Sequence, residues 1–199
     1  INAGINHFDT ACVYTDGDSE RLLGHLAAPH RDQLVIATKV GGLVDASPAT
    51  IRTQFDASRT RLNMEMVDVL YLHRFDPNTP LAATFDTFAD WHRQGAFRYL
   101  GLSNFAAWQV MAVNALCAER GISFQVCQPM YNLVKRQAEV EILPMCADQN
   151  ILVASYSPLG GGLLTGKYAA GEQGRLSSDD MYANRYGPDW MHRSAAELA

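Results

Sequence analysis

Six short apolar runs recur along this chain, and the segments between them carry helical signals. The runs lie near residues 5–9, 34–39, 67–73, 99–103, 124–129 and 152–157. Their spacing averages about 30 residues, as a strand and its crossover helix require. Runs that are apolar on both faces suit a parallel sheet covered by helices. The sequence therefore predicts an α/β fold made of six βα units.

Helix-start signals support this pattern. Asp18-Ser19-Glu20 precedes the first helical segment, and Ser47-Pro48 puts a proline at the favoured first position of a helix that runs through Leu62. Further helices are predicted over 81–93, 107–119 and 140–149. Because no low-complexity segment or linker interrupts the series, residues 1–199 are expected to form a single domain.

Two architectures accommodate repeated βα units, a (β/α)₈ barrel and a doubly wound open sheet. A dinucleotide-binding doubly wound fold would place G-x-G-x-x-G after its first strand, where this chain has Asp9-Thr-Ala-Cys-Val-Tyr14. Polar residues instead end almost every strand-like run: Asp9, Lys39, His73, Ser103, Asn104, Gln128, Tyr156 and Ser157. Such a distribution is typical of the C-terminal face of a (β/α)₈ TIM barrel, here with about six βα units.

Composition narrows the function classes. At 199 residues and 48% hydrophobic, the chain can bury a sizeable core. Its formal net charge of −5, without a lysine–arginine stripe, argues against a nucleic-acid partner. The chain shows neither an apolar run of about 18–20 residues nor the regions of a secretory signal, so we expect no membrane partner. The four cysteines lack CxxC and metal-ligand spacing, which indicates structural thiols, no metal and a cytoplasmic location.

Four polar residues in the first third of the chain carry the functional interpretation: Asp9, Tyr14, Lys39 and His73. Each alone has a plain structural reading. The tyrosine could be a loop residue, the aspartate a turn or cap residue, the Asp–Lys pair a buried salt bridge, and His73 a core histidine, as His7 is expected to be. Together, at the same end of three successive strands, they indicate an active-site mouth because burying such charges is costly unless they are paired or used.

The chain resembles the aldo-keto reductases. The matching stretches run in that family's order and span about residues 4–168. They are Gly4–Tyr14, Ser19–Gly24, Ala37–Lys39, Val67–Pro77, Gly101–Asn104, Gln128–Asn132, and Tyr156–Leu159 with Leu164–Tyr168.

The resemblance implies a catalytic tetrad of Asp9, Tyr14, Lys39 and His73. A phenol can donate a proton to a reduced carbonyl if a neighbouring ammonium eases its ionisation, which would make Tyr14 the donor and Lys39 the ammonium. Asp9 would pair with Lys39, and His73 would orient the carbonyl and help relay the proton. Substrate binding would then involve Tyr14, His73 and Arg74.

The resemblance also implies NADPH as the cofactor, with Asp9 near it. Ser103, Asn104 and Gln128 would hold the nicotinamide carboxamide, although each amide could equally tie down a loop. Tyr156 would stack on the nicotinamide ring, although it could be a packing residue at the barrel rim. Ser157, Pro158, Leu159 and Gly160 open a glycine-rich run suited to pyrophosphate, although such a run is more often a flexible loop. Lys167 and Arg175 would be cations beside phosphate, or else solvated surface charges.

Several departures from the family pattern bear on function. The resemblance implies a first and a last barrel strand that have no match here, so we expect either a fragment of a longer polypeptide or a barrel completed by a partner chain. The segment that grips the adenine end would lie beyond Ala199, so the choice of NADPH over NADH rests on resemblance.

The expected activity is carbonyl reduction of a small-molecule aldehyde or ketone. The alternatives are a non-catalytic NADPH-binding redox sensor that engages a partner and an inactive truncated fragment. The physiological substrate and the oligomeric state are not written in the sequence.

Overall fold

The structure is a computed structural model and describes residues 1–42, 45–168, 173–177 and 186. It divides the chain into two compact units. The first contains residues 1–127 with 150–152, and the second contains residues 128–149 with 153–199.

Six strands form one sheet, and their order in the sheet follows the chain from β1 to β6. They are β1 His7–Asp9, β2 Val35–Val40, β3 Val67–Leu72, β4 Phe97–Ser103, β5 Phe124–Gln128 and β6 Leu152–Val153. The pairs β1–β2, β2–β3 and β3–β4 are parallel. This order confirms the α/β prediction and is that of a (β/α)₈ barrel, of which the described residues provide six strands; a doubly wound sheet would reverse its strand order.

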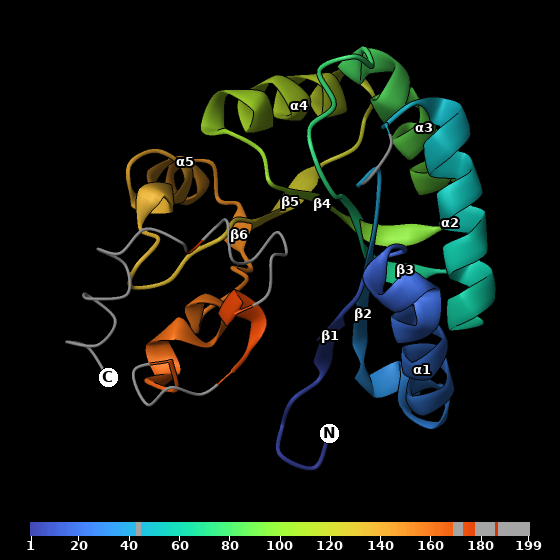
Figure 1. The fold of residues 1–199 in the computed structure, drawn as a ribbon. Coiled ribbons are helices and arrows are strands. Elements are labelled where there is room, and N and C mark those ends of the chain that lie inside the picture. Colours follow the sequence, from blue (N-terminus) through green and yellow to red (C-terminus); the bar gives the residue numbers. More distant parts are fainter. Residues whose placement is uncertain (43–44, 169–172, 178–185, 187–199) are drawn as a thin grey trace. The chain divides into compact units, whose positions relative to one another are not determined.

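Helices connect the strands as predicted. They are α1 Asp18–Ala27, α2 Pro48–Leu62, α3 Leu81–Arg93, α4 Ala107–Glu119 and α5 Ile142–Asp148. Short 3₁₀ segments are η1 Tyr14–Gly17, η2 Ala28–Gln33, η3 Gln137–Glu139, η4 Gly160–Thr165 and η5 Arg175–Ser177. In the first unit, α1 to α4 follow one another along one side of the strands (Figure 1). The start of α2 is as expected, because the Ser47 Oγ accepts from the Thr50 N–H at 3.3 Å and Pro48 occupies the first turn.

The two ends of the strand series differ most from the sequence prediction. β1 is 3 residues long and β6 is 2, against predicted runs over 5–9 and 152–157. All six residues of β3 are buried, whereas β1 alternates between exposed and half-buried. A strand at the edge of a sheet has one neighbour, so its ladder is shorter and less covered. His7 is exposed on β1, so the expectation that it is a core histidine is wrong.

The core of the first unit is built around aromatic side chains between α2, α3 and the sheet. The ring centres of Phe55 and Trp91 are 4.8 Å apart, and those of Phe88 and Trp91 are 5.3 Å apart. Both phenylalanines are wholly buried. Aromatic pairs in such edge-on geometry stabilise a core beyond the burial of their area, by about 0.5–1.5 kcal/mol each. This packing lies between α2, which contacts β2, and α3, which contacts β4, on either side of the strand that leads to His73.

The cysteines behave as the structural thiols that the sequence predicts. All four are free, and Cys117, Cys127 and Cys146 are buried, while Cys12 is half-buried. Burial raises the pKa of the Cys117 thiol to about 12 and that of Cys12 to about 11.

Among the described residues, no helix is both long and apolar enough to span a membrane.

Candidate active site

The carboxyl ends of β1, β2 and β3 lie at one edge of the sheet, since the strands are parallel. Asp9 is the last residue of β1, Lys39 is the next-to-last of β2, and His73 directly follows β3. Tyr14 opens η1, five residues after Asp9. The chain beyond β1 stays beside β2, because the Cys12 N–H donates to the Lys39 carbonyl at 3.2 Å. All four predicted side chains therefore start from the same end of the sheet.

Lys39 is the centre of this group. Its side chain is wholly buried, and its ammonium forms an ion pair with Asp9 Oδ1. The same Nζ donates to the Thr10 carbonyl at 2.7 Å. The Asp9 side chain keeps 31% of its surface exposed. The cation is thus hidden from water, and its partner is the group that reaches solvent.

The two rings complete the cluster. The Lys39 Nζ lies 5.0 Å from the centre of the Tyr14 ring. The Tyr14 and His73 ring centres are 5.9 Å apart, with an angle of 81° between the ring planes. Tyr14 is 39% exposed, and His73 is buried. The structure therefore brings Asp9, Tyr14, Lys39 and His73 together, while their catalytic role stays a prediction.

The ammonium has an unusual electrostatic position. Burial lowers the pKa of Lys39 below its ordinary value of 10.5, and the Asp9 carboxylate acts in the opposite direction. Water cannot solvate the charge, so the cost of burying it exceeds what one carboxylate restores. Perturbed titratable groups of this kind gather at functional sites more often than elsewhere.

Sequence reasoning missed Tyr71. Its ring centre lies 5.6 Å from the Lys39 Nζ, and the side chain is wholly buried. Lys39, Tyr71 and Gly101 are level with one another on β2, β3 and β4. A Cβ at Gly101 would come within 2.3 Å of the Tyr71 ring, so glycine there leaves room for that ring. The period-2 spacing of Tyr71 and His73 could have signalled that both face the same side of the sheet.

The remaining candidates of the first unit follow β3 and β4. Ser103 ends β4 and is buried, while Asn104 has a left-handed φ of 60°. The Asn104 amide donates to the His73 carbonyl at 2.9 Å and to the Ser103 Oγ at 3.1 Å. This amide therefore ties the ends of β3 and β4 together, as the loop-holding interpretation predicted. Arg74 is half-buried, next to His73.

In the second unit, Gln128 ends β5 and is buried. Tyr156 is half-buried and forms an isolated parallel bridge with Met130. Its N–H donates to the Pro129 carbonyl at 3.0 Å, and its own carbonyl accepts from the Tyr131 N–H at 3.3 Å. The backbone of Tyr156 is thus held on both sides.

The glycine-rich run forms a structured turn. Ser157, Gly160, Gly161 and Gly162 all have positive φ, and η4 begins at Gly160. The Asn132 amide holds the Ser157 carbonyl at 2.9 Å. The N–H groups of Gly160 and Gly162 bond to carbonyls within the run itself.

The rest of this set lies beside that turn or at its rim. Pro158 and Leu159 are exposed. The Lys167 side chain packs beside Gly162, where an added Cβ would lie 3.1 Å from its Nζ. The Arg175 side chain lies outside the described residues. Glycine-rich turns with positive φ and an adjacent ammonium fit the phosphates of a dinucleotide. Among the described residues, no cluster of three or more His, Cys, Asp or Glu side chains could hold a metal ion.

The sequence of the chain is similar to those of several known proteins. The family model described as "Aldo/keto reductase family" matches residues 1–190, so the chain belongs to the aldo/keto reductase family. Aflatoxin B1 aldehyde reductase member 2 of Rattus norvegicus is 36% identical over 97% of this chain and 54% of its own length. Aldo-keto reductase family 7 member A3 of Homo sapiens is 38% identical over 94% of this chain and 61% of its own length. An uncharacterized oxidoreductase, YrpG of Bacillus subtilis, is 32% identical over 84% of the chain. The chain thus spans little more than half the length of these first relatives.

Proposed function

We propose that the protein reduces an aldehyde or a ketone to the alcohol, with NADPH as the reductant and Tyr14 as the proton donor. One observation carries the proposal. The wholly buried Lys39 ammonium is paired with Asp9 and lies 5.0 Å from the centre of the Tyr14 ring, with His73 at the edge of that ring. Membership of the aldo/keto reductase family supports a nicotinamide-dependent oxidoreductase.

A dihydronicotinamide, when bound, would supply hydride for the carbonyl carbon. Tyr14 gives its hydroxyl proton to the carbonyl oxygen as charge develops there, which leaves a phenolate. An ammonium attracts a nearby phenolate, and it does so more strongly inside a protein than in water because the effective dielectric constant there is lower. Lys39 therefore stabilises the phenolate, and Asp9 keeps Lys39 charged. His73 orients the carbonyl oxygen toward Tyr14, and water returns the proton to the phenolate.

The residues of each unit support a part of cofactor binding. In the first unit, Ser103 and Asn104 end β4 beside His73 and offer a hydroxyl and an amide for the carboxamide. In the second unit, the turn at Ser157–Gly160 and Lys167 offers backbone dipoles and a cation for phosphate. Gln128 and Tyr156 would contact the nicotinamide, and Arg175 would stand near phosphate. NADPH rather than NADH rests on the family resemblance.

Aldehydes are the first substrates to test, because the rat relative is named as an aldehyde reductase. Arg74 follows His73 and would line the substrate pocket. We also propose a cytoplasmic location, since nothing in the composition indicates a secreted or membrane-bound protein.

The decisive experiment follows NADPH absorbance with 4-nitrobenzaldehyde for wild type and Tyr14→Phe. Tyr99→Phe, which changes an exposed tyrosine on β4, is the matched control. We expect Tyr14→Phe to lower kcat by about 10²–10⁴-fold, the usual contribution of a general acid, with NADPH affinity unchanged. Undiminished turnover in Tyr14→Phe would remove the phenol as donor. Tight NADPH binding without turnover on a broad carbonyl panel would favour the redox sensor, and failure to bind NADPH would indicate an inactive fragment.

A further inference from the structure

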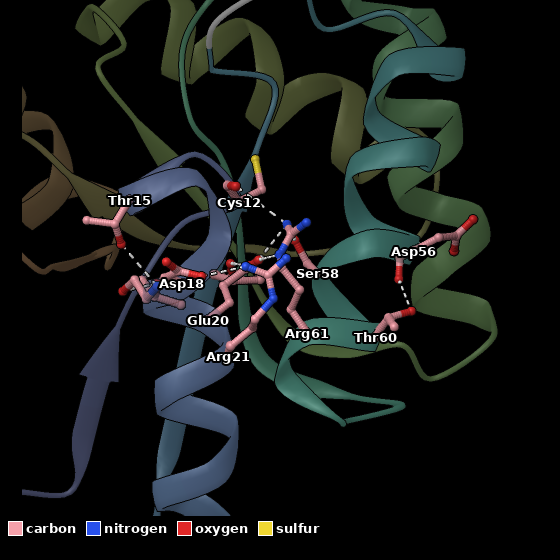
Figure 2. A network of polar contacts seen from close by, with 12 residues as sticks. Cys12, Thr15, Asp18, Glu20, Arg21, Asp56, Ser58, Thr60 and Arg61 are labelled. Carbon is pink, nitrogen blue, oxygen red and sulfur yellow. Dashed lines mark hydrogen bonds and ion pairs between the residues drawn. The ribbon is translucent and has the colours of Figure 1, made fainter.

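A second charged group lies on the other face of β2, behind Lys39. Glu20 of α1 is wholly buried. It accepts a hydrogen bond from the Arg61 Nε of α2 at 2.7 Å and forms an ion pair with the Nη2 at 2.6 Å (Figure 2). Its second carboxylate oxygen accepts from the Thr38 hydroxyl at 2.5 Å. Thr38 and Lys39 are neighbours on β2, so their side chains point to opposite faces of the sheet. The Glu20 carboxylate is therefore anchored on the face of β2 opposite the Lys39 side chain.

Arg61 contacts the segment of residues 12–17, which carries Tyr14, at both ends of the segment. Its Nη2 donates to the Cys12 carbonyl at 3.4 Å, two residues before the tyrosine (Figure 2). Three residues after the tyrosine, the Arg61 stem packs on Gly17. A Cβ there would lie 2.7 Å from both Cδ and Nε of Arg61. One guanidinium thus contacts the chain on either side of Tyr14.

The segment needs such support because its backbone is strained. Thr15 and Asp16 have φ of 48° and 53°, and Gly17 follows with φ of 88°. Left-handed conformations in residues other than glycine persist only where surrounding contacts impose them. Tyr14 directly precedes this strained turn, so a change in the turn would move its ring.

Ordinary helix packing does not explain this pair well. A buried ion pair adds little net stability compared with apolar packing, so Glu20 and Arg61 are poorly explained as a device to hold α1 to α2. Their bonds run instead to the two elements of the candidate active site: to β2 through Thr38 and to the Tyr14 segment through Cys12.

We propose that Arg61, held by Glu20, is a positioning residue that sets the Tyr14 ring over the Lys39 ammonium. The inference deepens the proposed reductase function and rests on it. Arg61 acts on Tyr14 through the Cys12 carbonyl and Gly17.

The test uses two variants that change geometry without changing net charge. Arg61→Lys keeps a cation beside Glu20. The lysine lacks the forked guanidinium with which Arg61 contacts both Glu20 and the Cys12 carbonyl. The double variant Glu20→Gln/Arg61→Met removes both charges together, so it leaves no buried charge without a partner. In both we expect kcat to fall by about 10–10²-fold, since a misplacement of about 1 Å can cost about 10²-fold, with little change in the KM for NADPH.

A second readout does not depend on turnover. Carbon NMR of ring-labelled tyrosine, with Tyr14→Phe to assign the resonance, follows the ionisation of Tyr14 with pH. The charged or titratable groups known to face this ring among the described residues include Lys39, itself paired with Asp9, and His73. If Arg61 positions the ring, Tyr14 in both variants titrates at higher pH than in wild type.

Arg31→Met is the matched control. Arg31 pairs at 2.8 Å with Asp68, another buried carboxylate, at the opposite end of the sheet. The Arg31→Met variant should lower the melting temperature at least as much as Arg61→Lys does, yet leave kcat and the Tyr14 titration unchanged. The inference is overturned if both Arg61 variants retain wild-type kcat and the wild-type Tyr14 titration. Turnover that persists in Tyr14→Phe would defeat the reductase mechanism instead, while the titration would still report whether Arg61 positions the ring.

Discussion

Two buried ion pairs occupy opposite ends of the same sheet, and they are built in opposite senses. At the carboxyl end, the cation of the Lys39–Asp9 pair has no exposed surface and the carboxylate has 31%. At the amino end, the Asp68 carboxylate is 3% exposed, while its partners Arg31 and Arg98 are 25% and 63% exposed. One end hides an ammonium, and the other hides a carboxylate.

This difference indicates that the Asp68 ion pair has a structural role, whereas the Lys39–Asp9 pair holds a destabilised charge that can serve function. Asp68 accepts from the Ile36 N–H at 2.8 Å as well as from Arg31, so it joins β2, β3 and η2 through several donors. A buried carboxylate with this many partners is well satisfied. Lys39 has Asp9 and one backbone carbonyl, and burial still lowers its pKa. In βα barrels, charge at the amino end of the strands is usually structural and charge at the carboxyl end is usually functional.

The largest effect is expected at the functional end. Lys39→Met should lower kcat by about 10²–10³-fold, because it removes the charge that stabilises the phenolate. The same variant should not lose stability. Asp9 can be hydrated without its partner, so the free energy of unfolding should stay the same or rise by up to about 2 kcal/mol.

Turnover assays with chemical denaturation of the same samples check both parts of this prediction. A Lys39→Met protein that is markedly less stable than wild type would mean that the pair is structural, like its counterpart at the other end.

The opposite result is expected at the amino end. Arg31→Met leaves the buried Asp68 with a single, more distant cation, Arg98 at 3.5 Å. Stranding a buried charge typically costs about 3–5 kcal/mol, and the remaining arginine should hold this loss near the lower limit. Denaturant titration measures the stability, and turnover measured below the unfolding transition should stay within about twofold of wild type. A tenfold loss of kcat would show that the two ends of the sheet are coupled.

Much of this arrangement could be predicted from the sequence. The order of strands and helices followed from periodicity and from helix starts such as Ser47-Pro48. The convergence of Asp9, Lys39 and His73 followed from parallel strands, whose carboxyl ends meet at one edge. The catalytic roles of these residues stay predictions.

Other features could not be predicted, for identifiable reasons. Tyr71 looks like one more apolar strand residue until the register places it level with Lys39 and Gly101. Glu20 and Arg61 are 41 residues apart, and nothing local marks either as buried. β1 and β6 are short because each is an outer strand of the described sheet and pairs with one neighbour only. The residue pattern of a strand does not indicate how many neighbours it has.

The smallest expected effect is a pH dependence that tests the poised state of Lys39. The pKa of Lys39 in the folded protein is below its ordinary value of 10.5. In the window between the folded pKa and 10.5, the folded protein has therefore lost the Lys39 ammonium proton, whereas the unfolded chain still holds it. The unfolded state then binds more protons, so stability rises with pH across this window, by at most about 1.4 kcal/mol per pH unit. The Cys12 and Cys117 thiols act in the opposite direction above their ordinary value of 9.0, because burial raises their folded pKa values. In the difference in unfolding free energy between wild type and Lys39→Met, the Cys117 contribution cancels, whereas that of Cys12 changes because the Lys39 charge acts on its pKa. Through the lower pKa of Lys39, this difference should become more favourable to wild type as pH rises through the window. A difference that stays flat would mean that the ammonium at the carboxyl end is as well satisfied as the carboxylate at the amino end, and the contrast between the two pairs would be lost.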